Sequence, residues 1–184
     1  MLRELEFVKD RIRKAGAILL QHQDNPGGIE RKADGSQVSD VDKRVSTYLS
    51  SELREAFPLY GLLDEEQSQD GSRFENEFCW VVDPLDSTRD YLGKGNEFGV
   101  IIGLTHNFKP VLGVTYKPQI DELAYAVSGQ GAYLQNGETE RRIVVNTDSE
   151  LKVLVSNSRS SAELEAMLRS ISLNKVERKG GSLK

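Results

Sequence analysis

Two stretches of the chain carry apolar residues at the spacing of an α-helix. In the first, apolar side chains recur every three or four positions between Leu2 and Leu19. In the second, Ser39 opens a segment with the form of a capping box, and apolar residues follow at four-residue spacing to Phe57. One apolar face is typical of a helix that packs on a core, so we expect two amphipathic helices. The charged, Pro- and Gly-containing residues 23–37 between them are expected to form a loop.

Beyond the second helix the pattern changes to short β-rich runs. Residues 59–63 and 78–82 form two such runs, and both lead into carboxylates. From Phe98 onward four further runs are separated by short polar turns, and Asn136-Gly137 marks a tight hairpin before the next run. Short strands at regular spacing predict a mostly antiparallel meander.

The last stretch alternates between β and α patterns. The run KVLVSNSR predicts a strand, SAELEAMLRSI a helix and NKVERKGGSLK a second strand. We therefore expect an α+β fold: residues 1–149 form a metal- and phosphate-binding domain with two helices on a mainly antiparallel sheet, and residues 150–184 begin an α/β domain. Two strands and one helix are too little to cover both faces of a sheet, so we expect the chain to be truncated at Lys184.

Composition and charge exclude several classes of protein. Of the 184 residues, 38% are hydrophobic and 29% are charged, which is typical of a soluble globular protein. The net charge of −5 lacks the basic excess of nucleic-acid-binding proteins, so an anionic partner would be a small molecule bound through a bridging cation. Cys79 is the only cysteine, and the apolar run at 15–20 is too short to cross a membrane. These features favour a cytoplasmic protein without a membrane partner.

The run WVVDPLDST at 80–88 places two acids directly after an apolar strand. Pro84 fixes its own φ and keeps the preceding residue extended, so the chain turns sharply and the carboxylates of Asp83 and Asp86 can converge. Glu65 follows the other short strand and would lie beside Asp83 if the two strands are neighbours. Mg²⁺ prefers a few carboxylate oxygens, completed by water and substrate phosphate. The three acids are therefore predicted to bind Mg²⁺.

A phosphate site is expected next to these acids. If Asp86 caps a short helix, Ser87 and Thr88 occupy its first turn, where free N–H groups and the helix dipole favour a phosphate. A site for a cation and a site for an anion would then coincide.

Each of these features also has a simpler interpretation. The D-P-x-D sequence can be an ordinary turn with an aspartate cap, and Glu65 can be a solvated strand end. Asp42 can be only the capping partner of Ser39, and Lys32 can be a solvated loop lysine.

Four segments taken together resemble the inositol monophosphatase family: VSDVD at 38–42, DEE at 64–66, WVVDPLDST, and GGSLK at the C-terminal end. Within this family the chain is most similar to the bacterial 3′(2′),5′-bisphosphate nucleotidases. The resemblance implies a layered sandwich fold, Mg²⁺ as cofactor, and hydrolysis of the 3′-phosphate of 3′-phosphoadenosine 5′-phosphate to AMP by metal-activated water, a reaction that would place the protein in sulfur assimilation. A phosphatase for inositol or sugar monophosphates is the alternative, because such enzymes share the metal site.

The resemblance also assigns roles position by position. It implies four metal ligands, namely the side chains of Glu65, Asp83 and Asp86 and the carbonyl of Leu85. Glu65 and Thr88 would position the attacking water, and Asp42 would lie near a further, weaker ion. Contacts to phosphate and nucleotide are expected from Ser87, Thr88, Ser182 and Lys184.

The chain departs from the family pattern in three places. Ser87 and Gly181 stand where the family usually has glycine and serine, respectively. The family's last metal-binding aspartate follows a later tryptophan, whereas Trp80 is the only tryptophan of these 184 residues. We therefore expect weak Mg²⁺ binding and little turnover, with a non-catalytic metal-binding module or a fragment unable to fold as alternatives. A homodimer stays open, because dimer surfaces cannot be read from one sequence.

Overall fold

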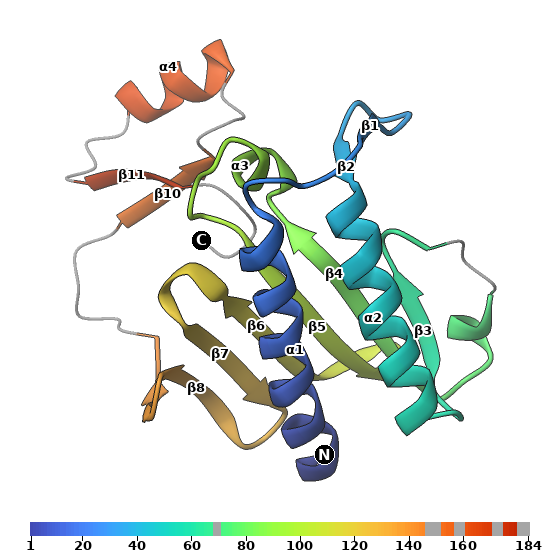
Figure 1. Cartoon of the computed structure of the whole chain (residues 1–184). Helices are drawn as coiled ribbons and strands as arrows, with labels where there is room; N and C mark the ends of the chain where they lie inside the picture. The colour runs from blue at the N-terminus through green and yellow to red at the C-terminus, as the bar shows by residue number, and fades with distance from the viewer. Residues whose placement is uncertain (68–70, 146–151, 157–160, 171–174, 180–184) are drawn as a thin grey trace.

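The computed structural model describes residues 1–67, 71–145, 152–156, 161–170 and 175–179. These residues form two long helices on one face of a seven-stranded sheet, together with a smaller unit of two strands and a helix near the C-terminal end (Figure 1). The expected α+β class is confirmed.

Helices α1 (Leu2–His22) and α2 (Asp40–Ala56) are the two helices that the periodicity predicts. They lie side by side, and Figure 1 shows both in front of the sheet. The predicted capping box opens α2: the Ser39 side chain accepts a hydrogen bond from the Asp42 N–H, and the Asp42 carboxylate accepts one from the Ser39 N–H. This reciprocal cap fixes where the helix begins.

The expected loop between the helices is wrong in part, because it contains a hairpin of strands β1 (Ile29–Arg31) and β2 (Gln37–Ser39). The tip is closed by two backbone hydrogen bonds, from Lys32 N–H to the Ser36 carbonyl and from Gly35 N–H to the Lys32 carbonyl, both at 2.9 Å. Gly35 has φ of +83°, which glycine adopts without strain. Each strand has only three residues, and all three residues of β1 are exposed. Such short strands show too little alternation of polar and apolar residues to be recognised from the sequence.

The large sheet has the strand order β3-β4-β5-β6-β7-β8-β9. Its strands are β3 (Gly61–Asp64), β4 (Phe78–Asp86), β5 (Gly99–His106), β6 (Lys109–Lys117), β7 (Glu122–Val127), β8 (Gly131–Asn136) and β9 (Thr139–Ile143). Every neighbouring pair is antiparallel except β3 and β4, which run parallel. The predicted meander and the hairpin at Asn136 are confirmed. Short helical connections η1 (Ser72–Phe74) and η2 (Pro118–Ile120) complete this part.

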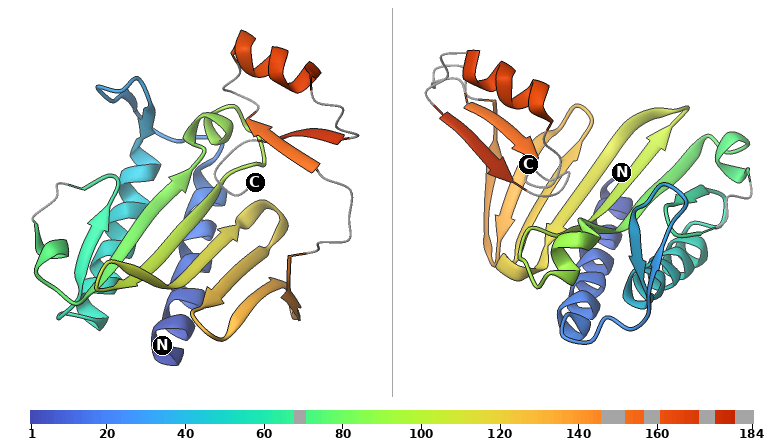
Figure 2. Two further views of the ribbon diagram at one scale, coloured as in Figure 1. Left: turned by 180° about the vertical axis from the view of Figure 1, so that it is seen from behind. Right: turned by 90° about the horizontal axis from the view of Figure 1, so that it is seen from above.

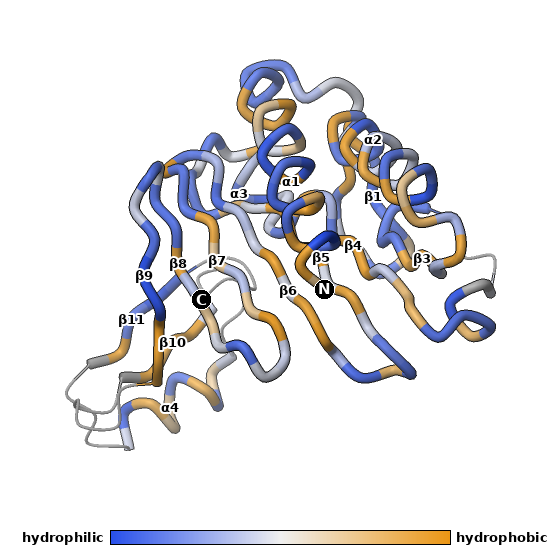
Figure 3. Tube along the Cα trace, turned by 90° about the horizontal axis from the view of Figure 1, so that it is seen from below, coloured by the Kyte–Doolittle hydropathy of each residue, from blue (hydrophilic) through white to orange (hydrophobic). Residues whose placement is uncertain are grey.

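The core lies between the two helices and the face of the sheet that they cover. Along β5 the side chains of Val100, Ile102 and Leu104 point into this core and are completely buried, while Ile101 and Gly103 face the other side. Figure 3 shows hydrophobic residues concentrated on β4, β5 and β6. Within the described residues, no helix has both the length and the hydropathy needed to cross a membrane.

The C-terminal unit consists of β10 (Lys152–Ser156), α4 (Ala162–Ser170) and β11 (Lys175–Lys179). The two strands pair in parallel, as the predicted strand–helix–strand unit requires. Figure 2 shows this unit on the side of the large sheet opposite α1 and α2. The domain boundary between 149 and 150 stays a prediction.

Candidate active site

The ends of β3 and β4 bring two predicted ligands together. The strands pair with Asp64 opposite Val82, and the Glu65 N–H continues the ladder by donating to the Val82 carbonyl at 3.1 Å. Glu65 and Asp83 are therefore neighbours across the two strands. Because Asp64 and Val82 are buried on the helix side, the alternation of a strand turns Glu65 and Asp83 to the opposite face of the sheet.

The sequence Asp83-Pro84-Leu85-Asp86 breaks the pairing of β4 with β5. Asp83 lies opposite Ile101 and Asp86 opposite Gly99, so the register shifts between the two acids. Pro84 has no N–H to give to the ladder, which is why a bulge forms here. The sequence predicts a sharp turn between the two carboxylates; the structure instead has a bulge there, and β4 continues through it to Asp86.

A shallow hollow of about 360 Å³ adjoins Glu65 and Asp83 on this outer face. Its lining residues are Leu63, Glu65, Val81, Val82, Asp83, Ile101 and Gly103. Most of this lining is apolar, and apolar surroundings strengthen the interaction of the two carboxylates with any nearby charge.

Asp83 is in an unfavourable environment for a carboxylate. Its Oδ1 is buried and has no hydrogen-bond partner among the described residues. Burial, followed by the negative charges of Glu65 and Asp86, raises the pKa of Asp83 to about 8. A divalent cation would satisfy the unpaired oxygen and offset the repulsion, so these residues fit a metal site.

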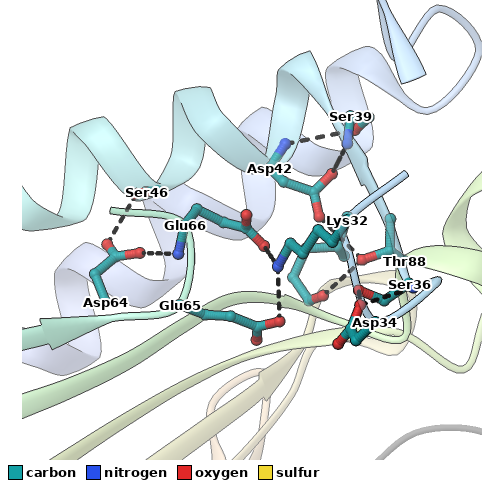
Figure 4. Close-up of polar contacts among 11 residues, drawn as sticks. Lys32, Asp34, Ser36, Ser39, Asp42, Ser46, Asp64, Glu65, Glu66 and Thr88 are labelled. Carbon is teal, nitrogen blue, oxygen red and sulfur yellow. Dashed lines mark hydrogen bonds and ion pairs between the residues drawn. The ribbon is translucent and has the colours of Figure 1, made fainter. Parts of the chain in front are cut away.

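The described residues nevertheless contain no group of three histidine, cysteine, aspartate or glutamate side chains gathered closely enough to hold a metal ion. A physical reason is visible in Figure 4: Glu65 turns toward Lys32, whose Nζ lies 3.0 Å from Glu65 Oε1. The negative charges of neighbouring carboxylates repel one another unless a cation lies between them. Here the Lys32 ammonium group is the cation that pairs with Glu65. The assignment of Glu65, Asp83 and Asp86 as ligands stays a prediction.

Lys32 is not the solvated loop lysine of the simpler interpretation. Its ammonium group also lies 2.6 Å from Glu66 Oε1, and its side chain is only 26% exposed. Burial alone would lower the pKa of Lys32, but the hydrogen bonds to Glu66 and Glu65 outweigh burial and raise it. No local pattern indicates this contact, because the polar segment that carries Lys32 predicts a loop and the β1–β2 hairpin forms there instead.

Asp64 is a second residue that the sequence analysis missed. This buried carboxylate accepts hydrogen bonds from Ser46 Oγ at 2.9 Å and Ser50 Oγ at 2.7 Å, both on α2, and from the Glu66 N–H at 2.9 Å. It therefore ties the turn that carries Glu65 and Glu66 to a helix. Two serines spaced by four on the apolar face of α2 are the signal that could have indicated a buried polar partner.

The structure brings Thr88 and Asp42 together, two residues to which the resemblance assigns separate roles. Thr88 Oγ1 lies 3.0 Å from Asp42 Oδ1 and 3.2 Å from the Leu85 carbonyl, and either oxygen can accept its proton (Figure 4). Burial raises the pKa of Asp42 against the opposing effect of hydrogen bonds from Ser39. Asp42 is thus both a helix cap and a partner of Thr88, so the two interpretations do not exclude each other.

The expectation that Asp86 caps a short helix is wrong. Asp86 is the last residue of β4, and the N-cap of α3 (Thr88–Leu92) is Ser87. Ser87 has φ of 69° and ψ of 46°, because the chain must reverse sharply between the strand and the helix. This left-handed conformation costs a serine about 1–2 kcal/mol and a glycine almost nothing. Thr88 is in the first turn as expected, whereas Ser87 precedes it.

Ser182 and Lys184, the expected nucleotide contacts, and Gly181 lie outside the described residues. Their placement and their contacts stay predictions.

Comparison with known proteins agrees with the motifs. The model of the inositol monophosphatase family matches residues 2–181. Inositol monophosphatase 3 of Solanum lycopersicum is 34% identical over 149 residues, which make up 80% of this chain and 54% of that protein. The chain thus spans about half the length of that relative.

Two further comparisons cover nearly the whole chain. The 3′(2′),5′-bisphosphate nucleotidase CysQ of Escherichia coli strain K12 is 31% identical over 183 residues, 98% of this chain and 74% of that protein. The crystal structure of the extragenic suppressor protein suhB from Bartonella henselae has a TM-score of 0.85 at 25% identity, and the match covers 98% of this chain and 71% of that chain. The similarity therefore extends over both the large sheet and the C-terminal unit.

Proposed function

Because the chain belongs to the inositol monophosphatase family, we propose that it acts as a Mg²⁺-dependent phosphomonoesterase that removes the 3′-phosphate of 3′-phosphoadenosine 5′-phosphate, releasing AMP. The observation that carries the metal-dependent part is Asp83: its Oδ1 is buried without a partner among the described residues, and burial together with two nearby acids raises its pKa to about 8. Such a group is stable as a carboxylate only beside a positive charge.

The Mg²⁺ ligands in this proposal are the side chains of Glu65, Asp83 and Asp86 and the carbonyl of Leu85. Glu65 and Asp83 already face the same side of the sheet, and the bulge at Pro84 brings Asp86 to the end of the same strand. Bound Mg²⁺ would supply the Lewis acidity that lowers the pKa of a water molecule and stabilises the leaving oxygen.

Thr88 would orient the attacking water. Its hydroxyl proton is directed to Asp42 or to the Leu85 carbonyl, at 3.0 and 3.2 Å, so the Thr88 oxygen is left to accept a hydrogen bond from water. Asp42 is buried and fixed by the α2 cap, and it therefore holds the threonine hydroxyl in one orientation.

The phosphate would lie at the start of α3. The N–H groups of the first turn have no partner within a helix, and they can donate to phosphate oxygens. Ser87 contributes its backbone N–H and hydroxyl to the same place, and Ser182 and Lys184 are proposed to contact the nucleotide.

The choice of substrate rests on the relatives. The nucleotidase CysQ is 31% identical over 98% of the chain, which supports the adenosine bisphosphate. Inositol monophosphatase 3 has the higher identity, 34%, over a shorter stretch, and this supports inositol monophosphate as the second candidate.

A phosphate-release assay with both substrates, in Mg²⁺ and in EDTA, tests the proposal. Because the family's last metal-binding aspartate is not among these 184 residues, we expect slow release that depends on Mg²⁺ and is faster from the adenosine bisphosphate. In Asp83→Asn this release should fall on the order of 100-fold, because the metal contributes several kcal/mol to the transition state. Faster release from inositol monophosphate would select the second candidate. Release that persists in EDTA, or absence of release from both compounds, would contradict a metal-dependent phosphatase and favour the non-catalytic module.

A further inference from the structure

We propose that Lys32 sets the cation selectivity of this site: by occupying one carboxylate oxygen of Glu65, it leaves Glu65 a single oxygen for a cation and thereby favours Mg²⁺ over Ca²⁺. This inference rests on the proposed function, since Glu65 is assigned there as a metal ligand. It concerns a residue that the sequence motifs do not include.

The contact that carries the inference is specific to one oxygen. Lys32 Nζ lies 3.0 Å from Oε1 of Glu65, whose side chain is 51% exposed. The described residues place no hydrogen-bond donor on Oε2 of Glu65. Lys32 therefore engages Oε1 of Glu65, and Oε2 is the oxygen left for a cation.

The ammonium group is fixed from the other side by Glu66. The distance from Lys32 Nζ to Glu66 Oε1 is 2.6 Å, and the Glu66 side chain is only 8% exposed, so water competes little for this ion pair. Glu66 is itself held, because its N–H donates to Asp64, which is bonded to two serines of α2. When a cation binds Glu65, Lys32 stays beside it through Glu66.

The backbone of Lys32 is equally constrained. Its N–H and carbonyl are both used in the closed tip of the β1–β2 hairpin, with Ser36 and Gly35 at 2.9 Å. Lys43 on α2 holds the base of the same hairpin through Glu30 on β1, at 2.7 Å. The lysine ammonium is thus a fixed charge beside Glu65.

The two cations differ in what they need from a carboxylate. Ca²⁺ takes six to eight oxygens and often binds both oxygens of one carboxylate, whereas Mg²⁺ takes six in a tight octahedron, keeps several waters and needs one oxygen from each acid. A lysine on Oε1 therefore removes a ligand that Ca²⁺ would use and Mg²⁺ would not. The positive charge of Lys32 by itself repels both divalent ions equally, so the ratio of the two affinities isolates the geometric effect.

Competition for bound Mn²⁺, followed by electron paramagnetic resonance, measures this ratio without any catalytic turnover. The full chain is loaded with Mn²⁺ and titrated with MgCl₂ or CaCl₂. In Lys32→Met we expect the affinity for Ca²⁺ relative to Mg²⁺ to rise by roughly tenfold, the lower end of the range for residues that orient metal ligands. Glu66→Gln should shift the ratio in the same direction, because it loosens the lysine while Lys32 itself is kept.

Lys43→Met is the matched control. It removes the same charge and an ion pair of the same hairpin, but Lys43 contacts Glu30 and not Glu65. We expect both affinities to rise a little and their ratio to stay unchanged. A ratio unchanged in Lys32→Met, or shifted as much in Lys43→Met, would overturn the role of Lys32 and leave the proposed function standing. If the unaltered chain binds none of the three ions, the proposed metal site fails and the inference falls with it.

Discussion

At the scale of single residues, the most perturbed carboxylic acid of the candidate site is Asp83. The Oδ1 atom of Asp83 is buried and has no hydrogen-bond partner among the described residues. Burial, together with the negative charges of Glu65 and Asp86, raises the pKa of the Asp83 carboxyl group from 3.8 to about 8. The neutral acid is therefore preferred in the folded, metal-free protein over a wide pH range. Ionising the Asp83 carboxylic acid at neutral pH costs free energy, and the attraction of a bound cation would offset this cost.

The raised pKa predicts an unusual dependence of stability on pH. Between the unfolded pKa near 3.8 and the folded pKa near 8, the folded protein holds a proton that the unfolded chain has lost, so the free energy of unfolding falls as pH rises through this window. We expect a loss of a few kcal/mol across it in EDTA, and a much flatter profile in Asp83→Asn. Urea unfolding at pH 5.5 to 8.5 measures both profiles; parallel profiles for the two proteins would contradict this account.

Ser87 gives a prediction about backbone strain. It has φ of 69°, a conformation that costs a serine about 1–2 kcal/mol and that Val tolerates even less. We expect Ser87→Gly to stabilise the protein by up to about 1 kcal/mol, since relief of strain exceeds the entropy that glycine adds to the unfolded chain, and Ser87→Val to destabilise it by about 2 kcal/mol. Thermal melts in EDTA compare the three proteins. A Ser87→Gly variant that melts earlier would show that the turn is not strained.

How much of the site the sequence could predict differs from residue to residue. That Glu65 and Asp83 lie side by side can be predicted from local signals, namely the two strand ends that they follow and the proline after Asp83. The contact of Thr88 with Asp42 spans 46 positions, and no local pattern in the sequence indicates it. Lys32 could not be found, because an ion pair between distant segments leaves no local pattern.

At the scale of elements, the helices and the meander follow from periodicity, whereas the β1–β2 hairpin does not. Helix α1 has 21 residues, over which one apolar face is repeated many times. Strand β1 has three residues, all exposed, and burial therefore imposes no alternation on it. The hairpin is held by its turn and by ion pairs to Glu65, Glu66 and Lys43, which are tertiary contacts.

The packing of α1 on the sheet predicts that Gly16→Ala destabilises the protein, whereas helix propensity alone predicts that it stabilises the protein. A Cβ added at Gly16 would lie 2.5 Å from a ring carbon of Tyr116, and that ring is fixed by a 3.0 Å hydrogen bond from its hydroxyl to Asp121. Gly16→Ala should gain about 1 kcal/mol in helix propensity but lose about 1–3 kcal/mol by overpacking, for a net loss.

The substitution Ala17→Gly, one position later, separates the effect of helix propensity from the effect of overpacking. Ala17 is exposed, so Ala17→Gly should cost about 1 kcal/mol from propensity alone. Urea unfolding of both variants provides the comparison. If Gly16→Ala is more stable than the unaltered protein, the close approach of α1 to β6 (Lys109–Lys117) is looser than the structure indicates.

At the scale of the whole molecule, the site joins segments that are far apart in the sequence. The β1–β2 hairpin supplies Lys32, α2 supplies Asp42, and the end of β3 leads to Glu65 (Figure 4). The end of β4 supplies Asp83 beside Glu65. Binding at this place therefore reports on the folding of the entire helix–sheet layer. Among the described residues, Lys32 is the cation that pairs with Glu65.

This arrangement predicts that Mg²⁺ stabilises the whole fold and that the effect grows with pH. Mg²⁺ binds the ionised form of Asp83, so below the pKa near 8 it must displace a proton, and its stabilising effect should increase from pH 6 to pH 8.5. At a concentration 100-fold above the dissociation constant the gain is about 2.7 kcal/mol. Asp83→Asn should be more stable than the unaltered protein at pH 8 in EDTA and yet gain almost nothing from Mg²⁺.

Asp24→Asn is the control. It removes an exposed acid that pairs with Lys94, and it should respond to Mg²⁺ like the unaltered chain. Thermal melts at several MgCl₂ concentrations measure these shifts; an equal gain in Asp83→Asn would place the stabilising ion elsewhere on the acidic surface.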